Sequence, residues 1–209
     1  MKKTLKEGIS EFGTPDMKYY AFDWDDNIMN MPTKIIVLDD QGEDVEMSTE
    51  DFAEYRGKIG KEDFDYKGHT IVGLANDAFR NFTIKGDKQF LIDSMRAEPG
   101  PAWDDFVEAI NGGSIFSIIT ARGHTPSVLK EGVYNLIVSK VGGLDPNTLV
   151  KNLEKYRDLA DEKTSSKKDI IREYLDMCKF YPVTYGESKI GAINPEEGKI
   201  KAMNEFISY

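Results

Sequence analysis

The stretch that begins at Pro101 constrains the fold more than any other part of this sequence. Apolar residues at positions 103, 106, 107 and 110 have the spacing of an amphipathic helix, which Gly112 and Gly113 end. An apolar run over 114–120 is typical of a buried strand, and a short loop leads to a second helix that begins at Pro126. Helix, strand, loop and helix in this order form the unit of a doubly wound parallel sheet. The sequence therefore predicts an α/β fold.

A second predicted strand, residues 17–22, leads directly into an acidic segment, Asp23-Trp24-Asp25-Asp26-Asn27. Strand geometry places Asp23 and Asp25 on the same side of the backbone. In open parallel sheets, ligands bind at the carboxyl ends of the strands. Two carboxylates at that place can hold a divalent cation, or one can attack an electrophile while the other moves protons.

Two other interpretations of this segment have to be weighed. Asp23, Asp25 and Asn27 match the first ligand positions of an EF-hand calcium loop, but Ile28 stands where that loop needs Gly and Lys34 where it needs Glu. The calcium loop is therefore excluded. An acidic turn that only ends a strand explains the segment equally well, so the rest of the chain has to decide.

The remaining sequence predicts further elements of both kinds. Residues 33–40 and 45–48 flank a polar turn and predict a β-hairpin, and Ser48 with Asp51 predicts the start of a helix. The signal between residues 60 and 100 is weak, with short helices expected around 76–82 and 88–96. Residues 180–185 predict a strand that Pro182 weakens.

Three more helices are expected toward the end of the chain. They begin after Asp145-Pro146, at Ser166 and at Asn194-Pro195. The second is expected to bury Ile170, Ile171, Tyr174 and Cys178, and the third has an apolar stripe of Ile200, Met203, Phe206 and Ile207.

Composition narrows the functional classes. The 209 residues are enough for one domain with an insertion, or for one large and one small domain. A formal charge of −10 makes long nucleic acids poor partners, although a nucleic-acid end could still meet a local basic pocket. No apolar run approaches the length of a membrane span, and no signal peptide is evident. The single cysteine, Cys178, suits a buried thiol in a reducing compartment, so we expect a cytoplasmic protein without membrane partners.

Two motifs together resemble a known family. Asp23-Trp24-Asp25-Asp26-Asn27 after an apolar strand looks like the first motif of the haloacid dehalogenase (HAD) superfamily of Mg²⁺-dependent phosphohydrolases. Ile118-Ile119-Thr120-Ala121-Arg122 is similar to its second motif, an apolar strand that ends in Thr or Ser. Both motifs in this order are far more specific than either alone. The resemblance covers the first strand and the chain from Pro101 onward, but not residues 31–96 in detail.

The resemblance implies a Rossmann-like (HAD) parallel-sheet core made of residues 1–30 and 97–209. A direct strand–helix–strand crossover needs only about 30 residues, far fewer than separate Asp23 from Thr120. An α+β cap is therefore expected as an insertion over residues 31–96, between the two motifs. Caps of this kind exclude water and choose the substrate in that family.

The resemblance also implies roles for individual residues. Asp23 would be the nucleophile and a metal ligand, and Asp25 would move protons while its backbone carbonyl binds Mg²⁺. Thr120 would hydrogen-bond a phosphoryl oxygen, and Arg122 would bind the substrate phosphate. Asn27 stands where the family usually has Thr or Val, and it can hydrogen-bond across the loop. His124 is expected either to meet the phosphate or to lie in a solvent-exposed loop.

The family also needs a lysine beside the nucleophile and a later acidic strand end. Lys199 is the first choice for the lysine, with Lys167 or Lys168 as the alternative. If Lys199 serves, the acidic strand should follow the last helix, so the core would be incomplete and the sequence that of a truncated protein. If Lys167 or Lys168 serves, residues 181–185 would form that strand and Glu187 would be the metal ligand.

The predicted function is therefore Mg²⁺-dependent hydrolysis of a small phosphorylated substrate, a phosphomonoester, through an aspartyl-phosphate intermediate. The sequence does not say whether the substrate is a sugar phosphate, a nucleotide or a nucleic-acid end. The alternative is a non-catalytic or truncated HAD-like protein that binds a ligand or partner without turnover, which the missing acidic motif favours.

Overall fold

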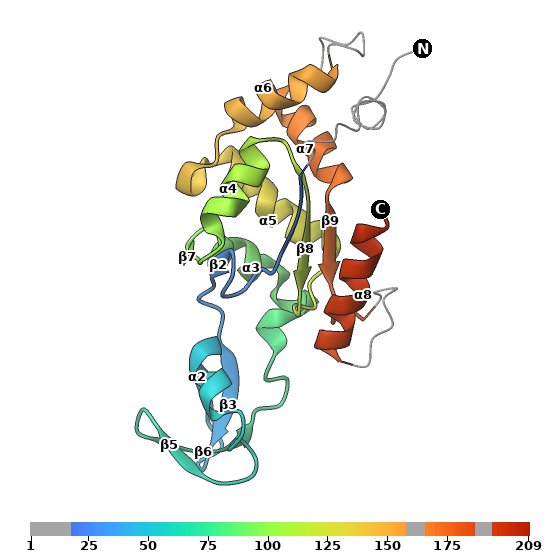
Figure 1. The fold of residues 1–209 in the computed structure, drawn as a ribbon. Helices are drawn as coiled ribbons and strands as arrows, with labels where there is room; N and C mark the ends of the chain where they lie inside the picture. Colours follow the sequence, from blue (N-terminus) through green and yellow to red (C-terminus); the bar gives the residue numbers. More distant parts are fainter. Residues whose placement is uncertain (1–17, 158–165, 187–193) are drawn as a thin grey trace.

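A three-stranded parallel sheet forms the centre of the larger part of the molecule (Figure 1). The computed structural model describes residues 18–157, 166–186 and 194–209. The strands are β1 (Tyr19–Phe22), β8 (Ile115–Thr120) and β9 (Lys179–Pro182), in the order β1-β8-β9. Phe22 pairs with Ile118, so the acidic segment and the end of β8 lie at the same edge of the sheet. The structure is a mixed α/β fold, as the sequence predicts.

Six α-helices of the described residues belong to this larger part. They are α3 (Asp87–Ser94), α4 (Trp103–Asn111), α5 (Pro126–Val138), α6 (Pro146–Arg157), α7 (Lys167–Met177) and α8 (Pro195–Ile207), with a 3₁₀ turn η3 (Val141–Gly143) between α5 and α6. No helix within the described ranges is both long and apolar enough to cross a membrane.

The predicted helix starts are confirmed by their caps. The Thr125 side chain accepts a hydrogen bond from the Val128 N–H at the start of α5, and the Asn194 side chain accepts one from the Glu197 N–H at the start of α8. Ser166 and Asp169 form a reciprocal capping box at the start of α7.

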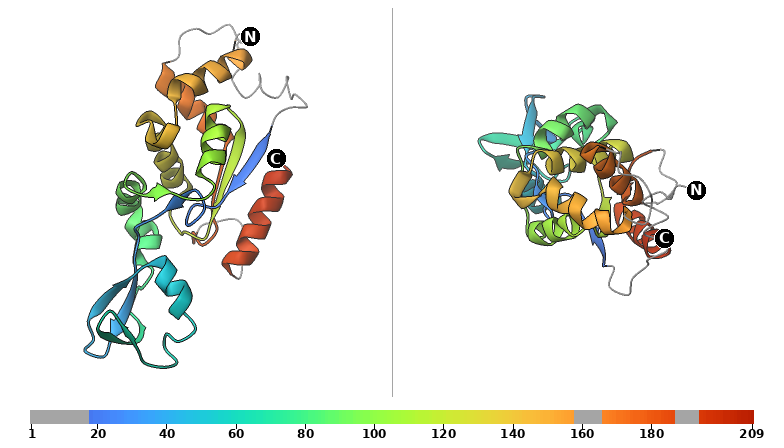
Figure 2. Two further views of the ribbon diagram at one scale, coloured as in Figure 1. Left: turned by 60° about the vertical axis from the view of Figure 1, so that its left-hand side comes forward. Right: turned by 90° about the horizontal axis from the view of Figure 1, so that it is seen from above.

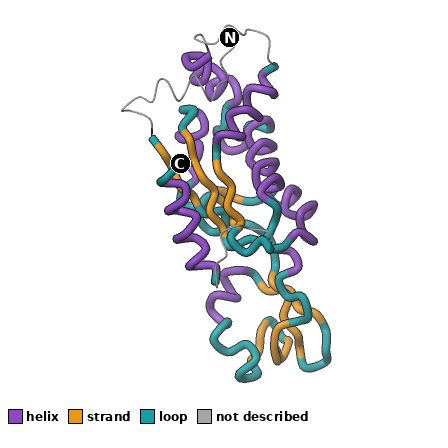
Figure 3. Tube along the Cα trace, turned by 90° about the vertical axis from the view of Figure 1, so that its right-hand side faces the viewer, coloured by secondary structure: helices purple, strands orange, loops and turns teal. Residues whose placement is uncertain are grey.

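The side chains of β1 point alternately to the two faces of the sheet, and their contacts show which helices cover each face. Phe22 packs edge-on against Phe106 of α4, with ring centres 5.3 Å apart. Tyr19, which points to the other face, lies 6.3 Å from Phe206 of α8. Accordingly, α8 lies on one side of the strands and the other helices on the opposite side (Figures 2 and 3).

A second sheet, of four strands, lies beyond the carboxyl ends of β8 and β9 (Figure 1). Its antiparallel strands β3 (Ile35–Asp39), β4 (Asp44–Met47), β5 (Phe64–Tyr66) and β6 (His69–Leu74) have the order β4-β3-β6-β5, and α2 (Thr49–Tyr55) follows β4. The predicted hairpin and the Ser48 cap of α2 are confirmed. We call residues 33–86 the small unit, since they enclose a hydrophobic cluster of their own: Val37, Val45, Met47, Tyr66 and Ile71.

The segment between residues 60 and 100 differs from the prediction in part. The 3₁₀ turns η1 (Arg80–Phe82) and η2 (Ile84–Gly86) and helix α3 lie near the expected short helices, but the β5–β6 hairpin was not predicted. Helix α3 packs with the main core, because Phe90 lies 4.9 Å from the Trp24 ring. Residues 31–96 therefore contribute to both cores.

Helix α8 turns a different face to the sheet than its apolar stripe suggested. Phe206 is buried as expected, but Ile200, Met203 and Ile207 are 64%, 38% and 74% exposed. The helix instead packs through Gly198, Ala202 and Phe206, which recur every four residues. The small side chains at 198 and 202 let α8 approach the sheet closely.

The acidic segment is held as a tight loop by backbone hydrogen bonds. The Met29 N–H donates to the Trp24 carbonyl at 3.1 Å, and Asp26 is left-handed with φ of 54°. Strand β2 (Met29–Asn30) then pairs with β7 (Glu98–Pro99). A Cβ at Gly100 would overlap the Asn27 carbonyl, so only glycine fits against this loop.

Candidate active site

Asp23 and Lys199 form the centre of the site. Asp23 follows β1 on the side covered by α8, and Lys199 extends from the second turn of that helix. The Lys199 Nζ donates a hydrogen bond to Asp23 Oδ2, although the two residues are 176 positions apart. Their side chains are 36% and 34% exposed, so a ligand in solvent can reach both.

The loop itself fixes the Asp23 carboxylate. Its Oδ1 accepts the Trp24 N–H at 2.8 Å. The Asn27 side chain accepts the Asp23 N–H at 3.2 Å, which is the hydrogen bond across the loop that the sequence suggested for this residue. The Trp24 side chain points away from α8, toward Phe90 of α3, and is fully buried.

The three candidate lysines have different surroundings in the structure. Lys199 is the candidate that contacts Asp23. Lys167 donates instead to the Asn147 side chain of α6, and Lys168 is exposed on the first turn of α7.

Thr120 ends β8, the strand beside β1. Since Phe22 pairs with Ile118, Thr120 is level with the start of the acidic loop. Its side chain is buried, and its Oγ1 accepts the Arg122 N–H at 3.2 Å. The hydroxyl proton of Thr120 can therefore be donated to another oxygen.

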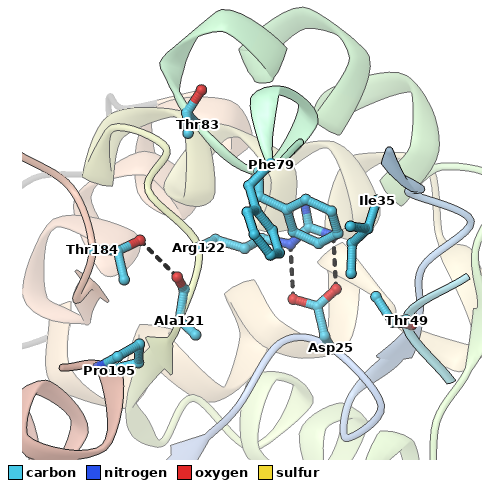
Figure 4. Close-up of a pocket in the computed structure, with 10 residues that line it drawn as sticks. Asp25, Ile35, Thr49, Phe79, Thr83, Ala121, Arg122, Thr184 and Pro195 are labelled. Carbon is cyan, nitrogen blue, oxygen red and sulfur yellow. Dashed lines mark hydrogen bonds and ion pairs between the residues drawn. The ribbon is translucent and has the colours of Figure 1, made fainter. Parts of the chain in front are cut away.

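Arg122 is committed to Asp25 rather than open to a phosphate (Figure 4). Its Nε and one terminal nitrogen donate to the two Asp25 oxygens at 2.8 and 2.7 Å, in the bidentate geometry typical of this pair. The same nitrogen donates to Thr33 Oγ1 at 3.0 Å. The guanidinium is 1% exposed and lies 4.7 Å from the Phe82 ring. A substrate phosphate can meet this guanidinium only if the pair opens.

His124 extends this network and is fully buried, so the expectation of a solvent-exposed loop was wrong. Arginine can only donate, so His124 Nε2 accepts from Arg122 at 3.2 Å and the Nδ1–H donates to Asp87 of α3 at 2.8 Å. Burial lowers the pKa of His124, and the Arg122 charge lowers it further, against the opposing effect of Asp87. Both the hydrogen bonds and the lowered pKa therefore favour the neutral imidazole of His124.

Negative charge accumulates around the loop. Loss of solvent raises the pKa of Asp26, and the charges of Asp25, Asp23 and Glu50 raise it further. Glu50 belongs to α2, so the small unit contributes to the field at the site. Such a field attracts cations.

The described residues alone do not supply a magnesium shell. Within residues 18–157, 166–186 and 194–209, no group of three His, Cys, Asp or Glu side chains could hold a metal ion. Both oxygens of Asp23 and both of Asp25 already accept hydrogen bonds from protein donors. Glu187, the acidic ligand predicted for the case in which Lys167 or Lys168 serves, lies outside the described residues.

A cavity of about 500 Å³ adjoins this site, with walls from the small unit and from the main sheet (Figure 4). Asp25 and Arg122 line it together with Phe79 and Phe82. Neither phenylalanine was predicted as a site residue, nor were Thr33 and Asp87. The i, i+3 spacing of the two rings in a weakly patterned segment was a usable signal, whereas nothing local distinguished the other two.

Comparisons with protein-family models, with curated proteins and with solved structures found no match. The function is therefore inferred from the geometry of the site together with the two sequence motifs. That geometry combines a carboxylate with a lysine, a buried hydroxyl on the next strand and a second carboxylate clamped by an arginine.

The buried histidine predicts a pH dependence of stability. An unfolded chain binds the His124 proton with the ordinary pKa, near 6.5, and the folded chain binds it more weakly. The stabilisation is therefore complete above pH 6.5 and is lost as the pH falls through the lower folded pKa. We expect the melting temperature to fall between about pH 7.5 and about pH 5.5, and to fall less in His124→Gln, whose amide can donate and accept without titrating.

The matched control for this experiment is His69→Gln. His69 is the other of the two histidines and lies on β6 of the small unit, where its Nδ1 is 3.1 Å from Asp39 Oδ2 and its side chain is 49% exposed. Pairs whose histidine is exposed to solvent in this way contribute little to stability, so this variant should stay close to the parent's pH dependence. If differential scanning calorimetry gave the same slope of melting temperature against pH in the parent and in His124→Gln, the pH dependence could not be assigned to His124.

Proposed function

We propose that this chain is a HAD-like phosphatase that hydrolyses a small phosphomonoester through an aspartyl-phosphate on Asp23. The observation that carries the proposal is the contact between Lys199 and Asp23 at the carboxyl end of a parallel sheet. An ion pair that joins residues 176 positions apart, at the sheet edge where ligands bind, favours a site over a simple acidic turn.

In the first step, Asp23 attacks phosphorus and the bond to the leaving alcohol breaks. Two anions approach each other in this step, and at 4 Å their repulsion amounts to about 4 kcal/mol near a protein surface. The Lys199 ammonium offsets this repulsion because it already lies on Asp23 Oδ2. The Trp24 N–H keeps the other oxygen in place.

Thr120 would stabilise the negative charge on the phosphoryl oxygens. Its buried hydroxyl is fixed by the Arg122 N–H and lies on the strand next to Asp23. A preorganised donor in a water-poor site stabilises developing charge more than the same donor in water does.

Asp25 would protonate the leaving alkoxide and then take a proton from the water that hydrolyses the aspartyl-phosphate. Both of its oxygens are held by Arg122, so proton transfer through Asp25 requires this pair to open. Opening would also release the guanidinium toward the substrate phosphate. One movement would then supply both the acid/base group and the predicted phosphate contact.

The finer features of the fold belong to the same proposal. A Rossmann-like HAD core would consist of residues 1–30 and 97–209, with residues 31–96 as the cap. The position of the small unit beyond the strand ends, and the approach of Glu50 to the acidic loop, support this arrangement. A cytoplasmic location follows from the sequence argument on the single thiol.

Dependence on Mg²⁺ remains part of the proposal. When bound, the cation would offset the charge of the phosphoryl group. Its protein ligands would be the Asp23 carboxylate, the Asp25 backbone carbonyl and a third carboxylate, for which the sequence offers Glu187 only in the alternative in which Lys167 or Lys168 serves. No step above depends on the ion. Turnover during a magnesium titration, in the parent and in Glu187→Gln, tests this part separately.

A non-catalytic phosphate-binding protein is the second candidate. Two observations favour it: Asp25 is clamped by a buried arginine, and the described residues contain no group of three His, Cys, Asp or Glu side chains that could hold a metal ion. Isothermal titration calorimetry with inorganic phosphate separates the candidates, since binding without turnover of any ester supports this one.

The nucleophile gives the direct test of the proposed function. Asp23→Asn should lower turnover of p-nitrophenyl phosphate to background, because the amide has nearly the same shape but cannot attack phosphorus. The melting temperature should change little. Turnover equal to that of the parent would remove Asp23 from the mechanism.

The choice of lysine gives a second prediction. Lys199→Met should lower kcat about 100- to 1000-fold, because it removes a positioned charge while keeping most of the length of the side chain. Lys167→Met is the matched control and should keep the parent rate, since Lys167 contacts Asn147 instead. A larger loss in the control than in Lys199→Met would contradict the assignment.

A further inference from the structure

The cavity beside Asp25 has the size of a ligand site. Its volume of about 500 Å³ exceeds what a phosphate group alone needs and suits a small organic molecule. Pro195 lines it from the start of α8, the helix that carries Lys199, and Ala121 lines it from the residue after Thr120. A substrate whose phosphate lay against Asp23 could therefore place its leaving group in this cavity.

The walls of the cavity are apolar and in part aromatic. The small unit contributes Ile35, Phe79 and Phe82, and the loop after β8 contributes Ala121. The Phe79 ring is 42% exposed, and it is held edge-on against Phe52 and Phe82 at 5.6 and 6.3 Å. Phe82 lies against the Arg122 guanidinium, so Phe79 is the ring with more surface to offer a ligand (Figure 4).

Most polar groups in the lining are already hydrogen-bonded within the protein. The Thr83 hydroxyl donates to the Arg80 carbonyl at 3.0 Å, and the Thr184 hydroxyl donates to the Ala121 carbonyl at 2.7 Å. Arg122 and Asp25 bind each other. Sugar hydroxyls that entered this cavity would lose their hydrogen bonds to water and find few replacements.

We propose that this cavity selects phosphomonoesters whose alcohol carries a flat aromatic ring, which packs against Phe79. The chemistry at the phosphate rests on the proposed function, but binding of the ring does not. Two sources share this chemistry: a simple arylmethyl phosphate, and a nucleoside monophosphate whose base, rather than its ribose, occupies the cavity. Arg122 binds Asp25 in the closed pair and would meet the reacting phosphate when the pair opens, so neither state leaves its guanidinium for a second phosphate, and a monophosphate fits better than a diphosphate.

Two matched pairs of substrates test the selection. AMP and ribose 5-phosphate differ by the base, and 2-naphthylmethyl phosphate and ethyl phosphate differ by the ring, while all four release a primary alcohol. We expect kcat/KM to be roughly ten-fold higher for the ringed member of at least one pair. A preference in the AMP pair alone assigns a nucleoside, and a preference in the naphthyl pair assigns an apolar aryl group. No preference in either pair overturns the proposal.

Phe79→Ala should raise KM roughly ten-fold for the preferred ringed substrate and leave KM for its ringless partner unchanged. Leu74→Ala is the matched control, because Leu74 is a 45% exposed apolar residue of the small unit that does not line the cavity. It should behave as the parent does. Equal effects of Phe79→Ala on both members of the pair would overturn the role of the ring.

Calorimetry with 2-naphthylmethyl phosphonate, which cannot be hydrolysed, distinguishes failure of the pocket from failure of the proposed function. Binding that Phe79→Ala weakens, in a protein that turns over no ester, supports the aromatic pocket and rejects the phosphatase. Turnover of esters without binding of the phosphonate rejects the aromatic pocket and keeps the phosphatase.

Discussion

The buried guanidinium of Arg122 is the contact on which the arrangement of the two parts depends. It binds both oxygens of Asp25 in the acidic loop, Thr33 at the entrance to the small unit, and His124, which in turn binds Asp87 of α3. Removing one partner of a fully buried pair costs about 3–5 kcal/mol because the other charge is left without compensation, and the cost is smaller here since the Asp25 side chain is 21% exposed. The loop, the small unit and α3 therefore cannot move independently of this one side chain.

This constraint bears directly on the proposed chemistry. Alternation along β1 directs Asp23 toward α8 and Lys199, and Trp24 toward α3 and Phe90. The nucleophile thus lies where a ligand reaches it, while its neighbour anchors the loop in the core. Asp25 would have two roles, because the carboxylate that is proposed to transfer protons also binds Arg122. A substrate that opened this pair would couple its own binding to a shift of the small unit.

Local signals in the sequence predicted the elements that local interactions decide. Helix starts followed from caps such as Ser48, and both motif strands followed from apolar runs that end in polar residues. The β5–β6 hairpin was missed because its turn has positive φ at Lys67 and Gly68, where Asn-Gly or Asp-Gly is the usual signal. Helical periodicity showed which residues of α8 share a face but not which face is buried. The pairing of Arg122 with Asp25 depends on tertiary geometry, and no single stretch of sequence encodes it.

The central claim is that phosphate passes through a covalent intermediate on Asp23. Rapid acid quenching during turnover of p-nitrophenyl phosphate, followed by mass spectrometry of proteolytic peptides, tests it most directly. We predict one phosphoryl group on the peptide that contains Asp23, sensitive to hydroxylamine as an acyl phosphate is, and absent from Asp23→Asn. Steady turnover with an unmodified Asp23 peptide at every quench time, or with the phosphoryl group on another residue, would contradict the claim.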